Sequence, residues 1–354
     1  MKPQPYLPPA TRLLGAGGLA FALALGALLG TSTGCTRSQA ADDDTDVAIP
    51  PVHLNRTFTV APGGKLVMDL DRGAIDIRTS DRPEVAITVD REVRRTSEKK
   101  ARQLLAAHQI SFEQQGNTVT VHARLDSSLK SWRNWGSGLQ VRYTVTLPAQ
   151  FDLDLKTAGG SITVPDLTGT VLASTSGGSL KLGAIQGPVT CRTSGGSISV
   201  KSASQPADLR TSGGNVTIEI AKAAAKLSTS GGSIRVDSAY GPLEADTSGG
   251  NIDIRDAHAA VDASTSGGSV SARLAADQTG GCRLSTSGGN VRLTVPREIH
   301  ADIDARTSGG SVNTDLPITV QGTVKRNELV GRIGEGGRLL RLRTSGGSIH
   351  LTQN

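Results

Sequence analysis

The sequence predicts an all-β protein, a β-solenoid in which coils of about 18 residues stack on one another, with one short helix in its N-terminal part. Three observations predict this fold: a motif that recurs at a fixed step, an alternation of apolar and polar residues within each repeat, and a shortage of aromatic residues. The chain has 354 residues, of which 43 are Gly and only 3% are aromatic. So few large side chains exclude several conventional cores, whereas stacked layers of Ile, Val, Leu and Ala can still fill one.

The motif Thr-(Ser/Ala)-Gly-Gly-(Ser/Asn)-(Ile/Leu/Val) occurs ten times along the second half of the chain. It begins at Thr157, Thr175, Thr193, Thr211, Thr229, Thr247, Thr265, Thr286, Thr307 and Thr344. The first six steps are 18 residues long, and the last three are 21, 21 and 37 residues long. A fixed short period indicates one supersecondary unit that stacks on copies of itself.

Each repeat contains two short strands, as one copy, residues 229–246, illustrates. Ile234 and Val236 alternate with polar residues, and Leu243 and Ala245 do the same after a Gly-Pro turn. A period of two residues is typical of strands with one buried face and one wet face. We therefore expect the two strands of each coil to lie on opposite sides of an apolar interior that all coils share.

The paired glycines are predicted to form the turn between successive strands. We expect them to supply backbone conformations with positive φ, which other residues disfavour. In the regular coils these turn residues are Gly177, Gly178, Gly195, Gly196, Gly213, Gly214, Gly231, Gly232, Gly249, Gly250, Gly267 and Gly268.

The repeated threonine is predicted to face inward. In each coil it follows, by two residues, a small or apolar residue such as Ala245 before Thr247. Residues two apart in a strand share a face, which favours an internal ladder of hydroxyl groups over an exposed threonine array.

The first 35 residues are typical of a secretory signal peptide, with a basic start and an uncharged apolar run over residues 13–30. An uncleaved membrane anchor is the alternative, because the run approaches the length that spans a bilayer. Residues 36–52 lack periodicity and are predicted to form a disordered tether.

The end of the apolar run, Gly34-Cys35, resembles a bacterial lipobox. The resemblance implies that Cys35 carries a lipid that anchors the protein in a membrane. Ser32 departs from the aliphatic residue that the motif prefers, so simple cleavage of the signal is the alternative. Thr36 after the cysteine implies, by the same resemblance, sorting to the outer membrane.

Residues 53–150 are predicted to form a looser, strand-rich part of the same structure, ahead of the repetitive solenoid of residues 151–354. Strands are expected near residues 66–70, 74–77, 85–89, 118–123 and 140–147. One helix is predicted near residues 97–108, beginning with a capping Ser97 and placed to cap the open end of the stack.

The chain resembles bacterial putative-adhesin domains of unknown function. The resemblance rests on these strands and the helix, on the serial Thr-Ser-Gly-Gly-Ser-Ile turns, and on the closing segment Gly334-Glu335-Gly336-Gly337. The resemblance covers about residues 53–354. It implies a β-solenoid protein of the cell envelope, often a lipoprotein, and it brings no catalytic residues.

Charge and motifs disfavour several other functions. The net charge of +6 forms no basic stripe in the second half, so nucleic acid is not an expected partner. The histidines lack metal-ligand spacing, and no cofactor motif is present. Glu219, Asp237 and Arg255 follow one another in an outward-facing column and are the candidates for a glycan-active enzyme, although a solvated charged face explains them as well. Cys191 and Cys282 are expected as buried free thiols.

Both tryptophans of the chain lie in one Gly/Ser-flanked loop. Trp132, Arg133 and Trp135 are therefore candidate ligand contacts, since aromatic and Arg side chains dominate recognition sites. Burial of the tryptophans against the predicted helix is the alternative.

The sequence thus predicts a non-catalytic, adhesin-like binding or scaffold protein of the cell envelope or cell surface, held to a membrane by a lipid anchor. Envelope polysaccharide or protein is the expected partner. A periplasmic sensor of envelope stress and a glycan-active β-solenoid enzyme are the alternatives.

Overall fold

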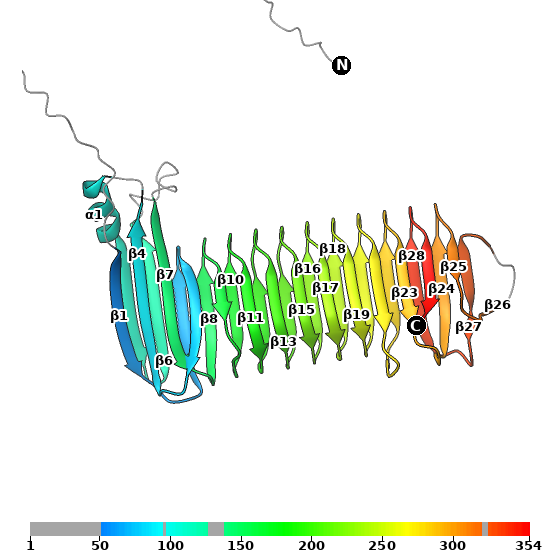
Figure 1. Cartoon of the computed structure of the whole chain (residues 1–354), viewed down its shortest axis with the longest axis horizontal. Helices are drawn as coiled ribbons and strands as arrows, with labels where there is room; N and C mark the ends of the chain where they lie inside the picture. Colours follow the sequence, from blue (N-terminus) through cyan, green and yellow to red (C-terminus); the bar gives the residue numbers. More distant parts are fainter. Residues whose placement is uncertain (1–50, 95–96, 127–137, 321–324) are drawn as a thin grey trace, which may run out of the picture. The chain divides into compact units, whose positions relative to one another are not determined.

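Two long β-sheets run along the protein in the computed structural model, which describes residues 51–94, 97–126, 138–320 and 325–354 (Figure 1). Residues Thr45–Asn354 form one unit. The predicted all-β solenoid is confirmed, and α1 (Glu98–Ala107) is the helix of the described residues. No helix in this part of the chain is both long and apolar enough to cross a membrane.

Sheet A has 14 strands. In spatial order they are β1 (Val52–Thr59), β4 (Glu84–Val93), β7 (Leu139–Pro148), β3 (Ala74–Ser80), β9 (Ile162–Val164), β11 (Leu180–Ile185), β13 (Ile198–Ala203), β15 (Val216–Ala221), β17 (Ile234–Ala239), β19 (Ile252–Ala257), β21 (Val270–Leu274), β23 (Val291–Val295), β29 (Ile349–Gln353) and β25 (Val312–Thr314).

Sheet B has 15 strands. In spatial order they are β26 (Thr319–Val320), β27 (Glu328–Ile333), β24 (Ala301–Thr307), β28 (Arg338–Thr344), β22 (Cys282–Thr286), β20 (Val261–Thr265), β18 (Leu243–Thr247), β16 (Ala225–Thr229), β14 (Ala207–Arg210), β12 (Val189–Arg192), β10 (Val171–Thr175), β8 (Phe151–Thr157), β2 (Gly64–Leu70), β6 (Thr118–Leu125) and β5 (His108–Gln115).

The regular coils stack in parallel, with one strand in each sheet. Ile234 of β17 pairs with Ile252 of β19, and Val236 pairs with Ile254. These four side chains are almost fully buried, so the inward columns that the alternation predicted form the core. Because parallel strands buried on one face must keep this register, each coil fixes the position of the next.

The repeated threonines form the predicted internal ladder. Thr247 is 7% exposed, and its Oγ1 donates a hydrogen bond of 2.8 Å to the carbonyl oxygen of Gly232 on the preceding coil. The same hydroxyl accepts a bond of 3.3 Å from the backbone N–H of Gly250 in its own turn. Each threonine therefore joins two coils at their buried corner.

The paired glycines lie in these turns, but the expectation of positive φ is wrong. None of the turn glycines of the regular coils is among the described glycines with positive φ. The second glycine is required for a different reason: a Cβ at Gly232 would overlap the carbonyl group of Gly214 on the neighbouring coil. A Cβ at the first glycine, Gly231, would lie 3.5 Å from the Gly213 oxygen, an ordinary contact.

At both ends the coils are not stacked in chain order, which the sequence analysis did not predict. The β2–β3 coil lies between the β6–β7 coil and the β8–β9 coil, and the β28–β29 coil lies between β22–β23 and β24–β25. At the C-terminal end β27 pairs with β24 in antiparallel fashion, and β28 then returns to pair in parallel with both β24 and β22. The first coil, β2–β3, and the last coil, β28–β29, are thereby paired on both sides.

The N-terminal part also contains strands that the sequence pattern did not predict. β1 begins at Val52, inside the stretch predicted as a tether, and β5 follows the helix directly. Helix α1 packs on β4, β5 and β7 through the buried Ala101 and Leu104, and in Figure 1 it lies beside the ends of β1 and β4. Ser97 precedes the helix but makes no side-chain capping bond, contrary to expectation.

Candidate functional site

A groove runs along the outside of the solenoid, where the turns from sheet A enter the strands of sheet B. Its volume is about 840 Å³. The turns supply a column of small, exposed residues: Pro188, Pro206, Ala224, Pro242 and Ala260. Because each turn is one coil away from the next, this column forms an apolar strip about 20 Å long.

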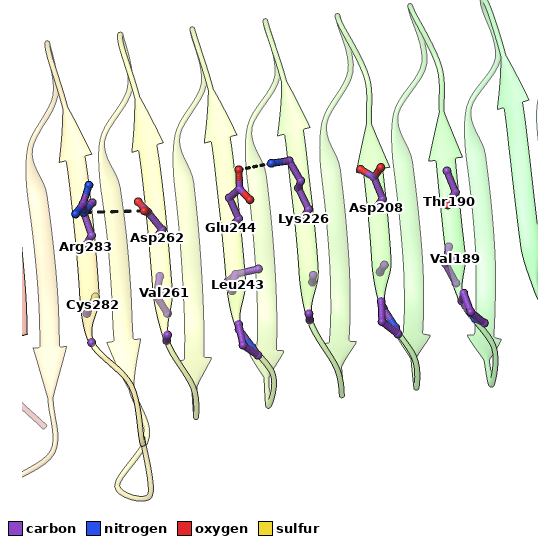
Figure 2. Close-up of a pocket in the computed structure, with 18 of the residues that line it drawn as sticks. Val189, Thr190, Asp208, Lys226, Leu243, Glu244, Val261, Asp262, Cys282 and Arg283 are labelled. Atoms are coloured by element: carbon purple, nitrogen blue, oxygen red, sulfur yellow. Dashed lines mark hydrogen bonds and ion pairs between the residues drawn. The ribbon is translucent and has the colours of Figure 1, made fainter. Parts of the chain in front are cut away.

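A polar row borders the strip two residues further along each strand. It consists of Thr190, Asp208, Lys226, Glu244, Asp262 and Arg283, which follow one another across neighbouring strands in Figure 2. These side chains point outward because the residue before each of them, such as Val189 or Leu243, is buried.

The charges of this row are paired with one another and with their neighbours. Lys226 forms an ion pair with Glu244, and Arg283 lies 3.9 Å from Asp262. Asp208 lies 2.9 Å from Arg210. The paired side chains of Lys226, Glu244, Asp262 and Arg283 remain 44–58% exposed, so the row offers both donors and acceptors to a ligand without a large excess of either charge.

The out-of-order β28 strand extends the groove. Cys282 of β22 pairs with Leu340 of β28, which places Leu339 and Arg341 at the end of the groove. Leu339 is 42% exposed. These two residues are more than 50 positions from Cys282 in the chain, so the sequence contains no signal that they belong to the groove.

The two cysteines are buried free thiols, as predicted. Burial, together with the Asp262 carboxylate, raises the pKa of the Cys282 thiol to about 12. Burial and Asp208 raise the pKa of Cys191 to about 12 as well. Although Cys282 lies at the groove, it is therefore protonated at neutral pH and is a poor nucleophile.

The column proposed for a glycan-active enzyme contains an ion pair. Arg255 lies 3.4 Å from Asp237, and Asp237 also lies 3.2 Å from Arg235. Glu219 is exposed on the coil that precedes Asp237. The described residues contain no group of three His, Cys, Asp or Glu side chains placed to hold a metal ion.

Several residues singled out in the sequence lie outside the described part of the chain. These are Cys35, with the predicted signal peptide, and the loop residues Trp132, Arg133 and Trp135. The groove residues, in contrast, were not singled out, although Pro188, Pro206 and Pro242 recur at multiples of 18 residues in the variable turn. That recurrence was the available signal for an exposed apolar strip.

Two continuous sheets, an internal threonine ladder and a groove that crosses successive coils define a β-solenoid repeat protein whose outer surface carries its candidate site. The chain belongs to the Toastrack DUF4097 family, which matches residues 64–352. No curated protein matches the chain.

The chain is similar to several bacterial proteins of solved structure. A putative adhesin from Bacteroides fragilis NCTC 9343 is 14% identical and covers 86% of this chain and 97% of its own, with a TM-score of 0.33. A putative adhesin from Parabacteroides merdae ATCC 43184 is 14% identical, covering 84% and 95%, with a TM-score of 0.36. A putative lipid binding protein from Parabacteroides distasonis ATCC 8503 is 13% identical, covering 85% and 96%, with a TM-score of 0.32.

Proposed function

We propose that this protein is a non-catalytic, adhesin-like binding module of the bacterial cell envelope that holds an extended polysaccharide chain along its groove. The single observation that carries the proposal is the exposed apolar strip with its parallel polar row. A polysaccharide presents apolar ring faces together with hydroxyl groups, and the strip and the row offer a complementary surface to each.

Charge and length both favour this ligand. The basic side chains of the polar row form ion pairs with its acidic side chains. The row therefore does not attract a polyanion such as nucleic acid in the way that an unpaired basic stripe does. The strip crosses five turns, which suits a chain of several sugars lying parallel to the solenoid axis. Affinity should therefore rise with chain length, because each further coil adds contacts.

The groove is tested by filling it. Ala224 is exposed within the strip, so Ala224→Arg obstructs the groove without entering the core. Ser230 is exposed in the turn at the opposite end of the same strand, and Ser230→Arg is the matched control. The measurement is retention of labelled protein on an array of immobilised oligosaccharides of two to ten sugars, with neutral hexose, N-acetylhexosamine and uronic acid series.

We expect wild type and Ser230→Arg to bind the longer oligosaccharides of at least one series and Ala224→Arg to lose that binding. Equal binding by all three proteins, or retention of no long oligosaccharide, would contradict the proposed function. A synthetic extended peptide on the same array that binds in a manner sensitive to Ala224→Arg would replace polysaccharide with protein as the ligand.

The proposed placement is the cell envelope, with Cys35 as the lipid-bearing residue and the outer membrane as its site. It is tested by protease digestion of internally tagged protein on intact cells, beside a Cys35→Ala variant and a metabolic lipid label. Digestion from outside, with label lost in the variant, is expected for a surface lipoprotein. Protection until the outer membrane is opened would replace the surface adhesin with a periplasmic scaffold or sensor.

A further inference from the structure

A second hollow lies on the sheet A side of the same turns, where the regular repeat is interrupted. Its volume is about 660 Å³. Most of its lining side chains carry hydrogen-bonding groups, among them Asp237, Arg255, Asp256, His258, Arg273 and Asp277. We refer to this hollow as the His258 cleft.

Two departures from the regular stacking of 18-residue coils form the cleft. The coil from Thr265 to Thr286 is 21 residues long, and its longer loop, which leads into Cys282 in Figure 2, brings Asp277 to the cleft. The out-of-order β29 strand brings Asn354 to the same place. The regular coils β11–β15 lack both contributions.

The longer loop is held firmly in position. Gln278 is 2% exposed, and its side-chain amide donates hydrogen bonds to the carbonyl oxygens of Ala259 at 3.2 Å and Gly280 at 2.5 Å. Arg338 donates a bond of 2.6 Å to the Gln278 side-chain oxygen. Such anchoring places the adjacent Asp277 carboxylate in a fixed geometry before any ligand arrives, which lowers the entropic cost of binding.

His258 is fixed from three directions. Its Nδ1 lies 2.5 Å from Asp277, and its Nε2 lies 3.1 Å from Asp256. The ring of Tyr240 stacks on it, with the ring centroids 4.3 Å apart and the planes inclined by 17°. These three contacts hold His258, which lines the cleft, in a fixed orientation, with Tyr240 stacked on its ring.

Tyr240 itself has no counterpart on the neighbouring coils. It is the only Phe, Tyr or Trp after Phe151 in the sequence, and the equivalent positions on the preceding coils are Gln186, Ser204 and Lys222. Tyr240 is 52% exposed, so burial does not explain why an aromatic side chain stands there. An exposed aromatic ring beside polar groups is a frequent feature of binding surfaces.

Arg273 points to a ligand that accepts hydrogen bonds. Its Nε donates a bond of 2.6 Å to the carbonyl oxygen of Arg255, and within the described residues no carboxylate forms an ion pair with it, whereas Arg255 pairs with Asp237 and Asp253. The rest of the Arg273 guanidinium is available as a donor at the cleft, whose lining also contains the acceptors Asp256 and Asp277.

From this arrangement we propose that the His258 cleft binds one or two units of a neutral saccharide. Arg273 donates to sugar oxygens, the Asp256 and Asp277 carboxylates accept from sugar hydroxyls, and the Tyr240 ring, stacked on His258, holds this side chain of the lining in position. The lining contains three aspartates and two arginines. This excess of acidic side chains disfavours an acidic sugar. The site is separate from the groove on sheet B, and the proposal does not depend on the groove being functional.

The test uses the disaccharides of the same array together with the corresponding immobilised monosaccharides, because one or two sugars fill the cleft but span only a small part of the groove. The variants are Arg273→Ala and Tyr240→Ala. Lys201→Ala is the matched control, because Lys201 is an exposed residue of the same outward column, on β13 and outside the cleft. Thermal unfolding by circular dichroism establishes that all variants are folded.

We expect wild type and Lys201→Ala to bind at least one neutral mono- or disaccharide. Arg273→Ala should weaken this binding about tenfold, the usual effect of losing a hydrogen bond from a charged donor, and Tyr240→Ala should weaken it several-fold. Ala224→Arg should leave it unchanged.

Three results would overturn the proposal: no binding of any neutral short sugar, binding of uronic acids alone, or equal affinities for wild type, Arg273→Ala and Tyr240→Ala. Loss of short-sugar binding in Ala224→Arg, with Arg273→Ala unaffected, would assign the short sugars to the groove. That result would refute the cleft and leave the proposed function standing.

Discussion

The two glycines of each turn should differ sharply in their tolerance of a methyl group. Replacement of the second glycine in Gly232→Ala places a Cβ against the carbonyl oxygen and carbon of Gly214 and 2.8 Å from the backbone nitrogen of Asn215. All three are backbone atoms of the preceding coil, which is held by parallel strand pairing on both sides. The overlap can be relieved only if the two coils move apart.

The magnitude follows from two effects. Overpacking of a well-packed region costs about 1–3 kcal/mol. Separation of the coils also disturbs the bond that joins them, from Thr229 Oγ1 to the Gly214 carbonyl oxygen, 2.8 Å long, and a buried polar group left without its partner costs about 1–3 kcal/mol. We therefore expect Gly232→Ala to lower the free energy of unfolding by about 2–6 kcal/mol.

The first glycine provides the matched control. In Gly231→Ala the Cβ meets the nearest atom, the Gly213 oxygen, at 3.5 Å, and the backbone there is not in the left-handed region. Such a substitution changes stability by less than about 1 kcal/mol and stabilises the fold if it restricts the unfolded chain. The assay is urea unfolding followed by far-ultraviolet circular dichroism. Equal midpoints for Gly231→Ala and Gly232→Ala would refute the close-approach explanation for the Gly-Gly pair.

Three further predictions follow from the described residues. Thr247→Val should cost about 1–3 kcal/mol of stability in the same urea assay because it removes a buried hydroxyl that bonds in both directions, while Thr247→Ser retains most of the stability. Cys191 and Cys282, whose thiol pKa burial raises to about 12, should resist iodoacetamide at pH 8 in the folded protein and react in urea; peptide mass mapping that finds them modified in the folded state would contradict their burial. Burial lowers the pKa of His108 to about 4, so the unfolded chain takes up a proton between pH 6.5 and 4 that the folded chain does not, and stability falls as the pH falls through this window. Thermal unfolding should show this loss in wild type and a smaller loss in His108→Leu, and identical pH profiles would exclude His108 as the cause.

The regular part of the fold could be predicted from the sequence because each coil repeats the same physical pattern. Ile234 and Val236 occupy the same inward columns as their counterparts 18 residues away, so a single register explains every regular coil. The Ser/Asn position of the motif has a local cause as well: the Asn215 side-chain oxygen accepts a bond of 2.8 Å from the backbone N–H of Ser233 on the next coil.

The stacking order at the ends could not be predicted in the same way. The turns at Thr307 and Thr344 carry the same Thr-Ser-Gly-Gly-Ser motif, so either could stack on the coil of Thr286. The antiparallel return through β27 decides between them, and β28, which contains Thr344, pairs with β22. This choice depends on pairing between distant segments, which a periodic motif does not encode.

The same limitation explains which parts of the candidate sites the sequence concealed. The groove column recurs with the repeat and was visible in Pro188, Pro206 and Pro242. Asp277, in contrast, lies in an insertion, and it meets His258 only because Gln278 anchors the inserted loop. A contact created by a single insertion has no second copy in the chain with which to compare it.

The departures from the repeat therefore carry more information about function than the repeat does. A regular coil needs its inward residues, its threonine and its second glycine for stacking, and any ligand contact that it makes is shared with its neighbours. The C-terminal coil is different, because β28 contributes Leu339 to the groove and β29 leads to Asn354 at the His258 cleft. The out-of-order stacking of β28 and β29, which pairs this coil on both sides, thus also completes both candidate sites. Folding of the C-terminal end and ligand binding should therefore be thermodynamically linked.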